Sequence, residues 1–195
     1  KEIYDELVPR IVALTEKLNV GDPVERETYM GPVATKWAYQ DFQDFCAELK
    51  EAGKILAGGE VITEGDFAKG YFCPPTIVVD VPIEHRLWRN EMFLPITMIH
   101  PVDSLGEAMD LANHSRYGLT AGFYGTEEEV GWFFDNIEAG VVYANRPQGS
   151  TTGAWPGFQP FGGWKGSGAS GKNAGGPYYL PLYMHEQSQT LIRRG

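Results

Sequence analysis

Two stretches of this sequence carry side chains that could do chemistry. In the shorter one, Glu91 and Phe93 stand just before an apolar run. A carboxylate at this place can accept two hydrogen bonds from a vicinal diol such as a ribose, and an aromatic ring offers its face to a flat ring. The alternative is a solvated glutamate beside a core phenylalanine, and the chemistry of the two residues alone favours that alternative.

The longer stretch runs from Gly149 to Gly176 and holds ten of the chain's 24 glycines. Aromatic residues are nevertheless spaced through it, at Trp155, Phe158, Phe161 and Trp164. Glycine lets the backbone come close to a ligand, and aromatic side chains anchor a loop on a core. We therefore predict an ordered binding loop rather than an irregular surface connection.

Two nucleotide-binding patterns also match inside this stretch. Residues 166–171 fit the dinucleotide fingerprint, but no strand precedes them and no clear helix follows. Residues 166–173 nearly fit a phosphate loop, except that Asn173 stands where a magnesium-binding Ser or Thr is required. A region this rich in glycine matches such patterns by accident, so we expect its second half to be structural.

Other chemistries find little support in the sequence. Cys46 falls on the apolar face of an expected helix and is predicted to be a buried filler rather than a nucleophile. Cys73 precedes two prolines at a strand entry and is not expected to be a reactive thiol. The four histidines show no pairing at ligand spacing, and we expect no metal site. No serine of the glycine-rich stretch sits in a Gly-x-Ser-x-Gly elbow, so a serine hydrolase is unsupported.

Hydrophobic spacing and capping signals place these stretches in an alternation of helices and strands. Helices are predicted at 3–18 with a break or kink at Pro9, at 36–52 after a Thr35 cap, after an Asp103 or Ser104 cap, and from a Thr126 capping box to about 138. Strands are predicted at 54–57, 75–81, 94–100, 119–125 and 141–145. This alternation indicates an α/β fold with a largely parallel sheet flanked by helices. Ligands bind outside the carboxyl ends of such strands, which is where the loop after Asn145 emerges.

The end of the chain is apolar and needs something to pair with. Residues 178–185 and 189–192 are predicted to be extended. They could form an edge strand of the same sheet or lie on a partner subunit.

The composition limits the classes of partner. The 195 residues are 43% hydrophobic, enough for a real core, and carry 26 acidic against 16 basic residues, a formal charge of −10. Without a basic stripe to neutralise phosphates, nucleic acid is not an expected partner, and an anionic membrane surface is disfavoured. No apolar run reaches the roughly 18 residues of a membrane span. No apolar signal core opens the sequence, so we expect a cytoplasmic protein.

Taken together, the motifs of the chain resemble the C-terminal part of the catalytic domain of the aldehyde dehydrogenase superfamily. They stand in the order that this family uses: Met30-Gly-Pro32, Gly70-Tyr-Phe72 with Pro75-Thr76, Glu91-Met-Phe93 with Pro95, Ala112-Asn113 with Tyr117-Gly-Leu119, and Pro160-Phe-Gly-Gly163 with Lys165, Ser167 and Gly168. Five motifs in register overturn the alternative of a merely solvated Glu91.

Within the superfamily, the chain looks like the branch that oxidises glutamate γ-semialdehyde, the 1-pyrroline-5-carboxylate dehydrogenases of proline breakdown. The resemblance rests on Thr152-Gly-Ala154 followed by Gly157, Gln159-Pro-Phe-Gly-Gly163 and Gly175-Gly-Pro177. It implies that Thr152, Gly153 and Ala154 hold the α-carboxylate of the substrate, where successive backbone N–H groups can form an anion nest. It also implies that Phe161 lines the aldehyde tunnel.

The same resemblance implies NAD as the cofactor, with NADP left open, and a homo-oligomer when the protein is full length. Glu91 is expected to bind the hydroxyls of the nicotinamide ribose, and Phe93 to pack by the nicotinamide. Two features depart from the family. Leu94 stands where the family usually has Gly, which could move Phe93, and the Trp155-Pro156 pair lengthens or stiffens the anchor loop.

The resemblance places the covalent chemistry outside this chain. In the family a cysteine attacks the aldehyde and a glutamate activates water, and both precede the region that matches Lys1. No catalytic residue is therefore expected here, and the chain is expected to be inactive alone. Residues 1–177 would be the C-terminal part of the catalytic domain, and 178–195 an extended tail suited to oligomerisation. Alternatives are an aldehyde dehydrogenase with another substrate, or a non-catalytic subunit or interaction module.

Overall fold

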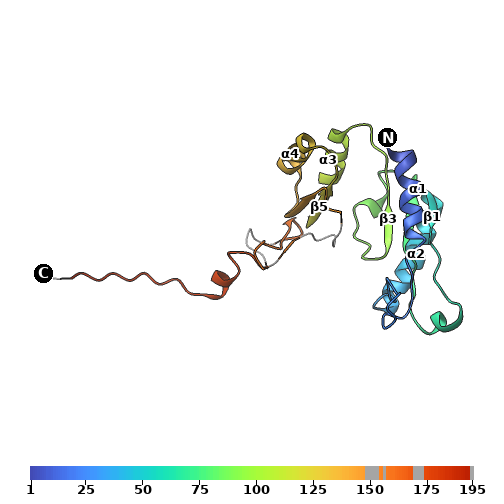
Figure 1. Ribbon diagram of the computed structural model, residues 1–195, viewed down its shortest axis with the longest axis horizontal. Helices are drawn as coiled ribbons and strands as arrows, with labels where there is room; N and C mark the ends of the chain where they lie inside the picture. The colour runs from blue at the N-terminus through green and yellow to red at the C-terminus, as the bar shows by residue number, and fades with distance from the viewer. Residues whose placement is uncertain (148–153, 156, 169–173, 194–195) are drawn as a thin grey trace. The chain divides into compact units, whose positions relative to one another are not determined.

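The computed structural model of the chain describes residues 1–147, 154–155, 157–168 and 174–193. The chain forms two compact units, Lys1–Asp103 and Ser104–Gly195. Helices and strands alternate through both (Figure 1), so the expected α/β composition is confirmed. None of the helices in the described ranges has the length and apolar character needed to cross a membrane.

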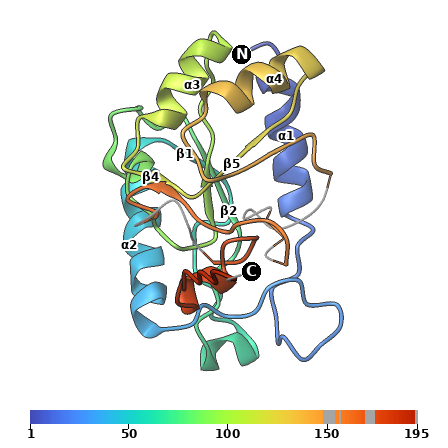
Figure 2. The ribbon, with the colours of Figure 1, turned by 90° about the vertical axis from the view of Figure 1, so that its left-hand side faces the viewer.

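The first unit is built on a three-stranded sheet. Its elements are α1 (Tyr4–Thr15), α2 (Lys36–Ala52), β1 (Lys54–Ala57), η1 (Gly65–Lys69), β2 (Thr76–Val79), η2 (Arg86–Trp88) and β3 (Ile96–Met98), where η denotes a short 3-10 helix. The central strand β2 pairs antiparallel with β1 and parallel with β3. All four residues of β2 are buried. The helices α1 and α2 lie alongside this sheet (Figure 2).

Local signals fix the long helix α2 at its predicted bounds. The Thr35 hydroxyl accepts a hydrogen bond from the Ala38 N–H at 3.1 Å and caps the first turn. The helix ends at Gly53, whose backbone is not helical, and glycine is required there because a Cβ would lie 2.5 Å from the carbonyl oxygen of Val79. Between these ends, Phe42, Cys46 and Leu49 turn one buried face towards the sheet.

The second unit pairs its strands in two short ladders. Its elements are α3 (Leu105–Asn113), β4 (Tyr117–Gly118), β5 (Thr120–Phe123), α4 (Glu127–Asn136), β6 (Val141–Ala144), β7 (Trp164–Lys165) and η3 (Leu180–Tyr183). Strands β5 and β6 run parallel, whereas β4 and β7 run antiparallel. Helices α3 and α4 bury Met109 and Phe133 beside β5, and the ring of Phe123 stacks on Phe133 at 5.0 Å between centroids.

The caps predicted for these two helices are confirmed. The Ser104 hydroxyl accepts the Glu107 N–H at 3.1 Å. At the start of α4, the Thr126 N–H donates to the Glu129 carboxylate at 2.7 Å, and the Glu129 N–H donates back to the Thr126 hydroxyl. This reciprocal pair is a capping box, and it fixes where the chain turns from β5 into α4.

Three expectations about the fold are corrected. Helix α1 runs through Pro9 without a break, because Pro9 and Asp5 are both exposed and water can satisfy the carbonyl that proline leaves unpaired. Sheet directions are mixed rather than largely parallel, since no crossover helix separates β1 from β2. In the tail, Pro181 lies in the first turn of η3, and residues 184–193 belong to no strand within the described chain.

Candidate active-site segments

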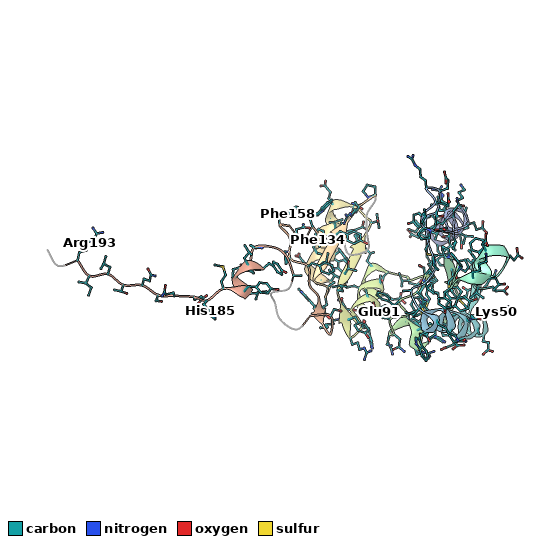
Figure 3. All side chains as sticks on the ribbon, turned by 90° about the horizontal axis from the view of Figure 1, so that it is seen from below. Lys50, Glu91, Phe134, Phe158, His185 and Arg193 are labelled. Atoms are coloured by element: carbon teal, nitrogen blue, oxygen red, sulfur yellow. The ribbon has the colours of Figure 1, made fainter. Side chains whose placement is uncertain are left out.

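The loop that carries Glu91 and Phe93 joins η2 to β3. Both side chains are exposed, Phe93 for 89% of its surface, and Figure 3 labels Glu91 on this loop. Phe93 has φ +53, a left-handed conformation that is uncommon for an aromatic residue and often marks a functional position. The backbone that follows is fixed on the sheet, because the Thr76 N–H donates to the carbonyl of Pro95 at 2.8 Å.

An inside-outside alternation explains why this loop presents its carboxylate and its ring. Met92 packs against the core cluster of Leu49 and Val78, and Leu94 packs against the cluster of Phe42, Cys46 and Cys73. Glu91, which precedes Met92, and Phe93, which stands between Met92 and Leu94, therefore face solvent. Leu94, which departs from the family's usual glycine, thus ties the loop to the core with a side chain that glycine lacks.

The two cysteines are buried, which confirms the prediction for Cys46 and is a new finding for Cys73. Cys46 is 3% exposed and Cys73 is fully covered. Desolvation by burial raises the pKa of Cys46 to about 11 and that of Cys73 to about 12, with the neighbouring Cys46 adding to the second shift. A thiol that stays protonated and covered is a poor nucleophile, so neither residue can take the attacking role.

The predicted substrate anchor is described only in part. Thr152 and Gly153 lie outside the described residues, whereas Ala154 and Phe161 are both half-buried. A tight turn follows Ala154: the Trp155 N–H donates to the Gln159 side chain at 2.9 Å, and the Trp155 carbonyl accepts the Gln159 N–H at 2.8 Å. Phe161 is held by a bridge in which its N–H donates to the carbonyl of Ala174 at 2.7 Å.

Close backbone approaches hold the chain after Phe161. A Cβ on Gly140 would stand 1.9 Å from the carbonyl oxygen of Gly162, and a Cβ on Gly168 would stand 2.0 Å from that of Gly163. Only glycine allows such contacts. The backbone of the Pro-Phe-Gly-Gly segment therefore packs directly against Gly140, the residue before β6.

Side chains then tie β7 to the rest of the second unit. Lys165 contacts Glu138 at 2.5 Å and donates to the carbonyl of Asn113 at 2.6 Å, and the Ser167 hydroxyl accepts the Gly118 N–H at 3.1 Å. The nucleotide-pattern matches begin in the turn after β7, and their residues 169–173 lie outside the described chain. The described residues Gly166 and Ser167 make hydrogen bonds to Arg116 and Gly118, and a structural role for the whole second half of the stretch stays a prediction.

A cavity of about 460 Å³ lies along β6. Residues 140–144 form one side, and Arg146, Ala154, Trp155, Gln159 and Pro160 complete it. Ala154 is the residue of this lining that the sequence analysis expected to bind substrate. Arg146, which carries a formal charge, was not singled out from the sequence. Within the described chain, no three His, Cys, Asp or Glu side chains gather to hold a metal ion.

The motifs in register and the α/β units that carry them define the class of protein. Residues 1–188 match the aldehyde dehydrogenase family, and the chain belongs to that family. The resemblance stated from the motifs is thereby confirmed.

Two of the following three relatives are named as members of the predicted branch. The 1-pyrroline-5-carboxylate dehydrogenase of Bacillus cytotoxicus is 40% identical over 96% of this chain and 35% of its own length. The solved structure of 1-pyrroline-5-carboxylate dehydrogenase from Thermus with bound NAD has a TM-score of 0.82 at 34% identity, covering 93% of this chain and 34% of that one. An aldehyde dehydrogenase of Physcomitrella patens, solved in complex with the reaction product succinate, has a TM-score of 0.80 at 30% identity, covering 93% of this chain and 35% of that one. The chain thus spans about a third of the length of these relatives.

Proposed function

We propose that this chain is a segment of an NAD-dependent aldehyde dehydrogenase that oxidises L-glutamate γ-semialdehyde to glutamate in proline breakdown. The observation that carries the proposal is the 40% identity to the Bacillus cytotoxicus 1-pyrroline-5-carboxylate dehydrogenase over nearly the whole chain. Two features of the described residues support it: the exposed pair on the loop before β3, and the cavity along β6.

The loop before β3 suits the nicotinamide end of NAD. Glu91 would accept hydrogen bonds from the ribose hydroxyls, and Phe93 would place its exposed ring beside the nicotinamide. When bound, NAD supplies the acceptor for the hydride that leaves the substrate. In the proposal, this chain orients the groups that bind the nicotinamide end. Met92 and Leu94 pack against the core clusters, and this keeps the Glu91 carboxylate and the Phe93 ring facing outwards.

The cavity along β6 suits the acidic end of the substrate. Ala154 lines it, and Phe161 follows a short turn later in the same segment. In the proposal, backbone N–H groups around Gly153 and Ala154 hold the α-carboxylate, with the Thr152 hydroxyl as a further donor. Phe161 packs against the aldehyde chain. The roles proposed for Thr152 and Gly153 rest on the family resemblance.

The covalent steps are proposed to use residues that this chain does not contain. Cys46 and Cys73 are buried and protonated, so the attacking thiolate must come from elsewhere in the enzyme. The isolated chain should therefore produce no NADH from NAD and glutamate semialdehyde. Robust turnover by the isolated chain would contradict this assignment.

The substrate assignment is tested in the full-length enzyme. We expect a strong preference in kcat/KM, on the order of 10²-fold, for glutamate semialdehyde over a neutral aldehyde of similar length, because a buried anion site without its anion leaves donors unpaired. Equal rates would exclude a carboxylate anchor. The succinate-bound relative favours succinate semialdehyde as a second acidic candidate. A higher kcat/KM for succinate semialdehyde than for glutamate semialdehyde would identify succinate semialdehyde as the preferred substrate.

We further propose that residues 1–177 belong to the catalytic domain and that the tail, 178–195, contacts another copy of the protein. Leu180, Tyr183, Leu191 and Ile192 are each at least 70% exposed in the described tail, an unusual amount of bare apolar surface. Removing residues 178–195 from the full-length enzyme should lower the mass measured by light scattering. An unchanged mass would refute a role of the tail in assembly.

A further inference from the structure

The side-chain amide of Gln159 lines the cavity along β6 and is only partly used by contacts of the described chain. Gln159 is exposed, and its side chain makes one hydrogen bond there, which it accepts from the Trp155 N–H at 2.9 Å. We propose that Gln159 is a specificity-determining residue, whose amide NH2 group donates a hydrogen bond to the carboxylate of an acidic aldehyde. This inference rests on the proposed function and adds to it a side-chain donor beside Ala154.

The bond from Trp155 identifies which atom of the amide is left for a ligand. A backbone N–H can only donate, so the atom that it contacts is the side-chain oxygen of Gln159. The nitrogen on the same carbon keeps both of its N–H donors, and no acceptor in the described part of the chain takes them. A carboxylate, which only accepts hydrogen bonds, matches such a donor.

Backbone contacts fix the position of this amide. Gln159 and Trp155 are joined a second time, because the Gln159 N–H donates to the Trp155 carbonyl at 2.8 Å, and Figure 3 labels Phe158 in this turn. A Cβ on Gly176, which has φ +71, would stand 2.7 Å from the Pro160 nitrogen, so only glycine lets the two segments pack this closely. A donor on a backbone held in this way loses less conformational entropy when it binds a ligand.

The position of the amide suits the acidic end of the proposed substrate. Its oxygen is bonded to the N–H of the Ala154–Trp155 peptide, so the NH2 group lies beside the residue proposed to hold the α-carboxylate. None of the described residues that line the cavity is acidic, and Arg146 is basic, so the lining does not repel an anion. A hydrogen bond to an ionised group is stronger than one between neutral groups, so this donor favours acidic over neutral aldehydes.

The test uses Gln159→Glu, Gln159→Ala and a matched control, Gln40→Glu, in the full-length enzyme. Gln159→Glu keeps an oxygen for the Trp155 N–H but replaces the two donors by a second oxygen, which repels a carboxylate. It should lower kcat/KM for glutamate semialdehyde roughly 10- to 100-fold, mainly through KM, and leave a neutral aldehyde of similar length within about 2-fold. Gln40→Glu adds the same charge to an exposed residue of α2 that does not line the cavity, and it should behave as the wild type.

Gln159→Ala separates substrate recognition from a merely structural role in the turn. It removes the donors together with the bond to the Trp155 N–H, and it should lower kcat/KM more for the acidic aldehyde than for the neutral one. If Gln159 served only the turn, Gln159→Glu would match the wild type with both aldehydes, and Gln159→Ala would lower kcat/KM for both by the same factor. That pair of results would overturn the proposal.

Inhibition by glutarate separates this inference from the proposed function. Glutarate is a non-reactive dicarboxylate, and its inhibition constant is measured against any aldehyde that the enzyme oxidises. The constant should rise roughly 10-fold or more in Gln159→Glu and stay unchanged in Gln40→Glu. A wild-type enzyme that glutarate does not inhibit, or equal constants in wild type and Gln159→Glu, would refute the role of Gln159. If the wild type shows no preference for acidic aldehydes, the proposed function fails, and the glutarate result still decides the inference.

Discussion

The contact between Gly140 and the Pro-Phe-Gly-Gly segment gives a sharp prediction. In Gly140→Ala, the added Cβ would stand 1.9 Å from the carbonyl oxygen of Gly162, whereas ordinary contact begins near 3.4 Å. Gly140 cannot retreat easily, because its N–H is bonded to the carbonyl of Gly118 at 3.0 Å. The segment must therefore shift by about 1.5 Å, the difference between 3.4 and 1.9 Å, and Phe161 shifts with it.

The magnitudes follow from the size of that shift. Overpacking of this kind costs about 1–3 kcal/mol in the free energy of unfolding. A displacement of about 1 Å beside a reacting group lowers turnover by up to about 10²-fold. We expect Gly140→Ala in the full-length enzyme to melt earlier and to lose activity with glutamate semialdehyde.

Gly131→Ala is the matched control for this substitution. Gly131 lies inside α4 and has nothing within 4 Å of the added Cβ, so alanine should stabilise the helix by about 0.5–1 kcal/mol. Melting temperature and kcat/KM are measured on both variants. If Gly140→Ala melts and turns over like the wild type, the close approach of Gly162 to β6 is not as described.

The remaining predictions concern a cap, the thiols and the loop before β3. Thr126→Ala should weaken the cap of α4 by about 1 kcal/mol. The Thr126 N–H and then its hydroxyl hold the pKa of Glu129 below its ordinary value. That contribution is complete above the unfolded pKa and is lost as the pH falls through the folded one. The variant lacks only the hydroxyl's share of it, so the gap between wild-type and variant melting temperatures should narrow in acid without closing, because the bond from the Glu129 N–H to the Thr126 hydroxyl does not depend on pH; a constant gap would contradict this. The pKa values of Cys46 and Cys73 are about 11 and 12, so both thiols stay protonated at about pH 8. They should react with a thiol reagent only as fast as the core opens. Immediate labelling of the native enzyme would show that they are accessible. Leu94→Ala should lower the free energy of unfolding by about 1–3 kcal/mol, speed the labelling of the thiols and raise KM for NAD. Leu94→Met should change little. Labelling of Leu94→Ala as slow as that of the wild type would show that Leu94 does not cover the thiols.

Local signals made much of the fold predictable. The bounds of α2 and β1 follow from a Thr35 cap, a single apolar face and Gly53, all within one continuous stretch. The capping box of Thr126 and Glu129 is likewise encoded within four residues. Glu91 and Phe93 could be chosen because their motif is a property of the sequence itself.

Features that depend on distant residues could not be read in the same way. The strands β4 and β7 are two residues each and exist because Tyr117 pairs with Lys165 across the second unit. The antiparallel direction of β1 depends on the path between it and β2 rather than on the residues of either strand. The cluster of Arg146 with the rings of Tyr143 and Trp155 could not be predicted either, because only folding brings these three side chains together.

Hydrogen bonds fix the chain at two points beside the cavity. The Asn145 side chain and the Gly125 backbone bond to each other, and Trp155 is bonded within its own turn to Gln159. The entropy of closing a chain segment between two held points varies only slowly with the length of the segment. Single-residue insertions or deletions between Pro147 and Ala154 should therefore leave the melting temperature of the full-length enzyme nearly unchanged.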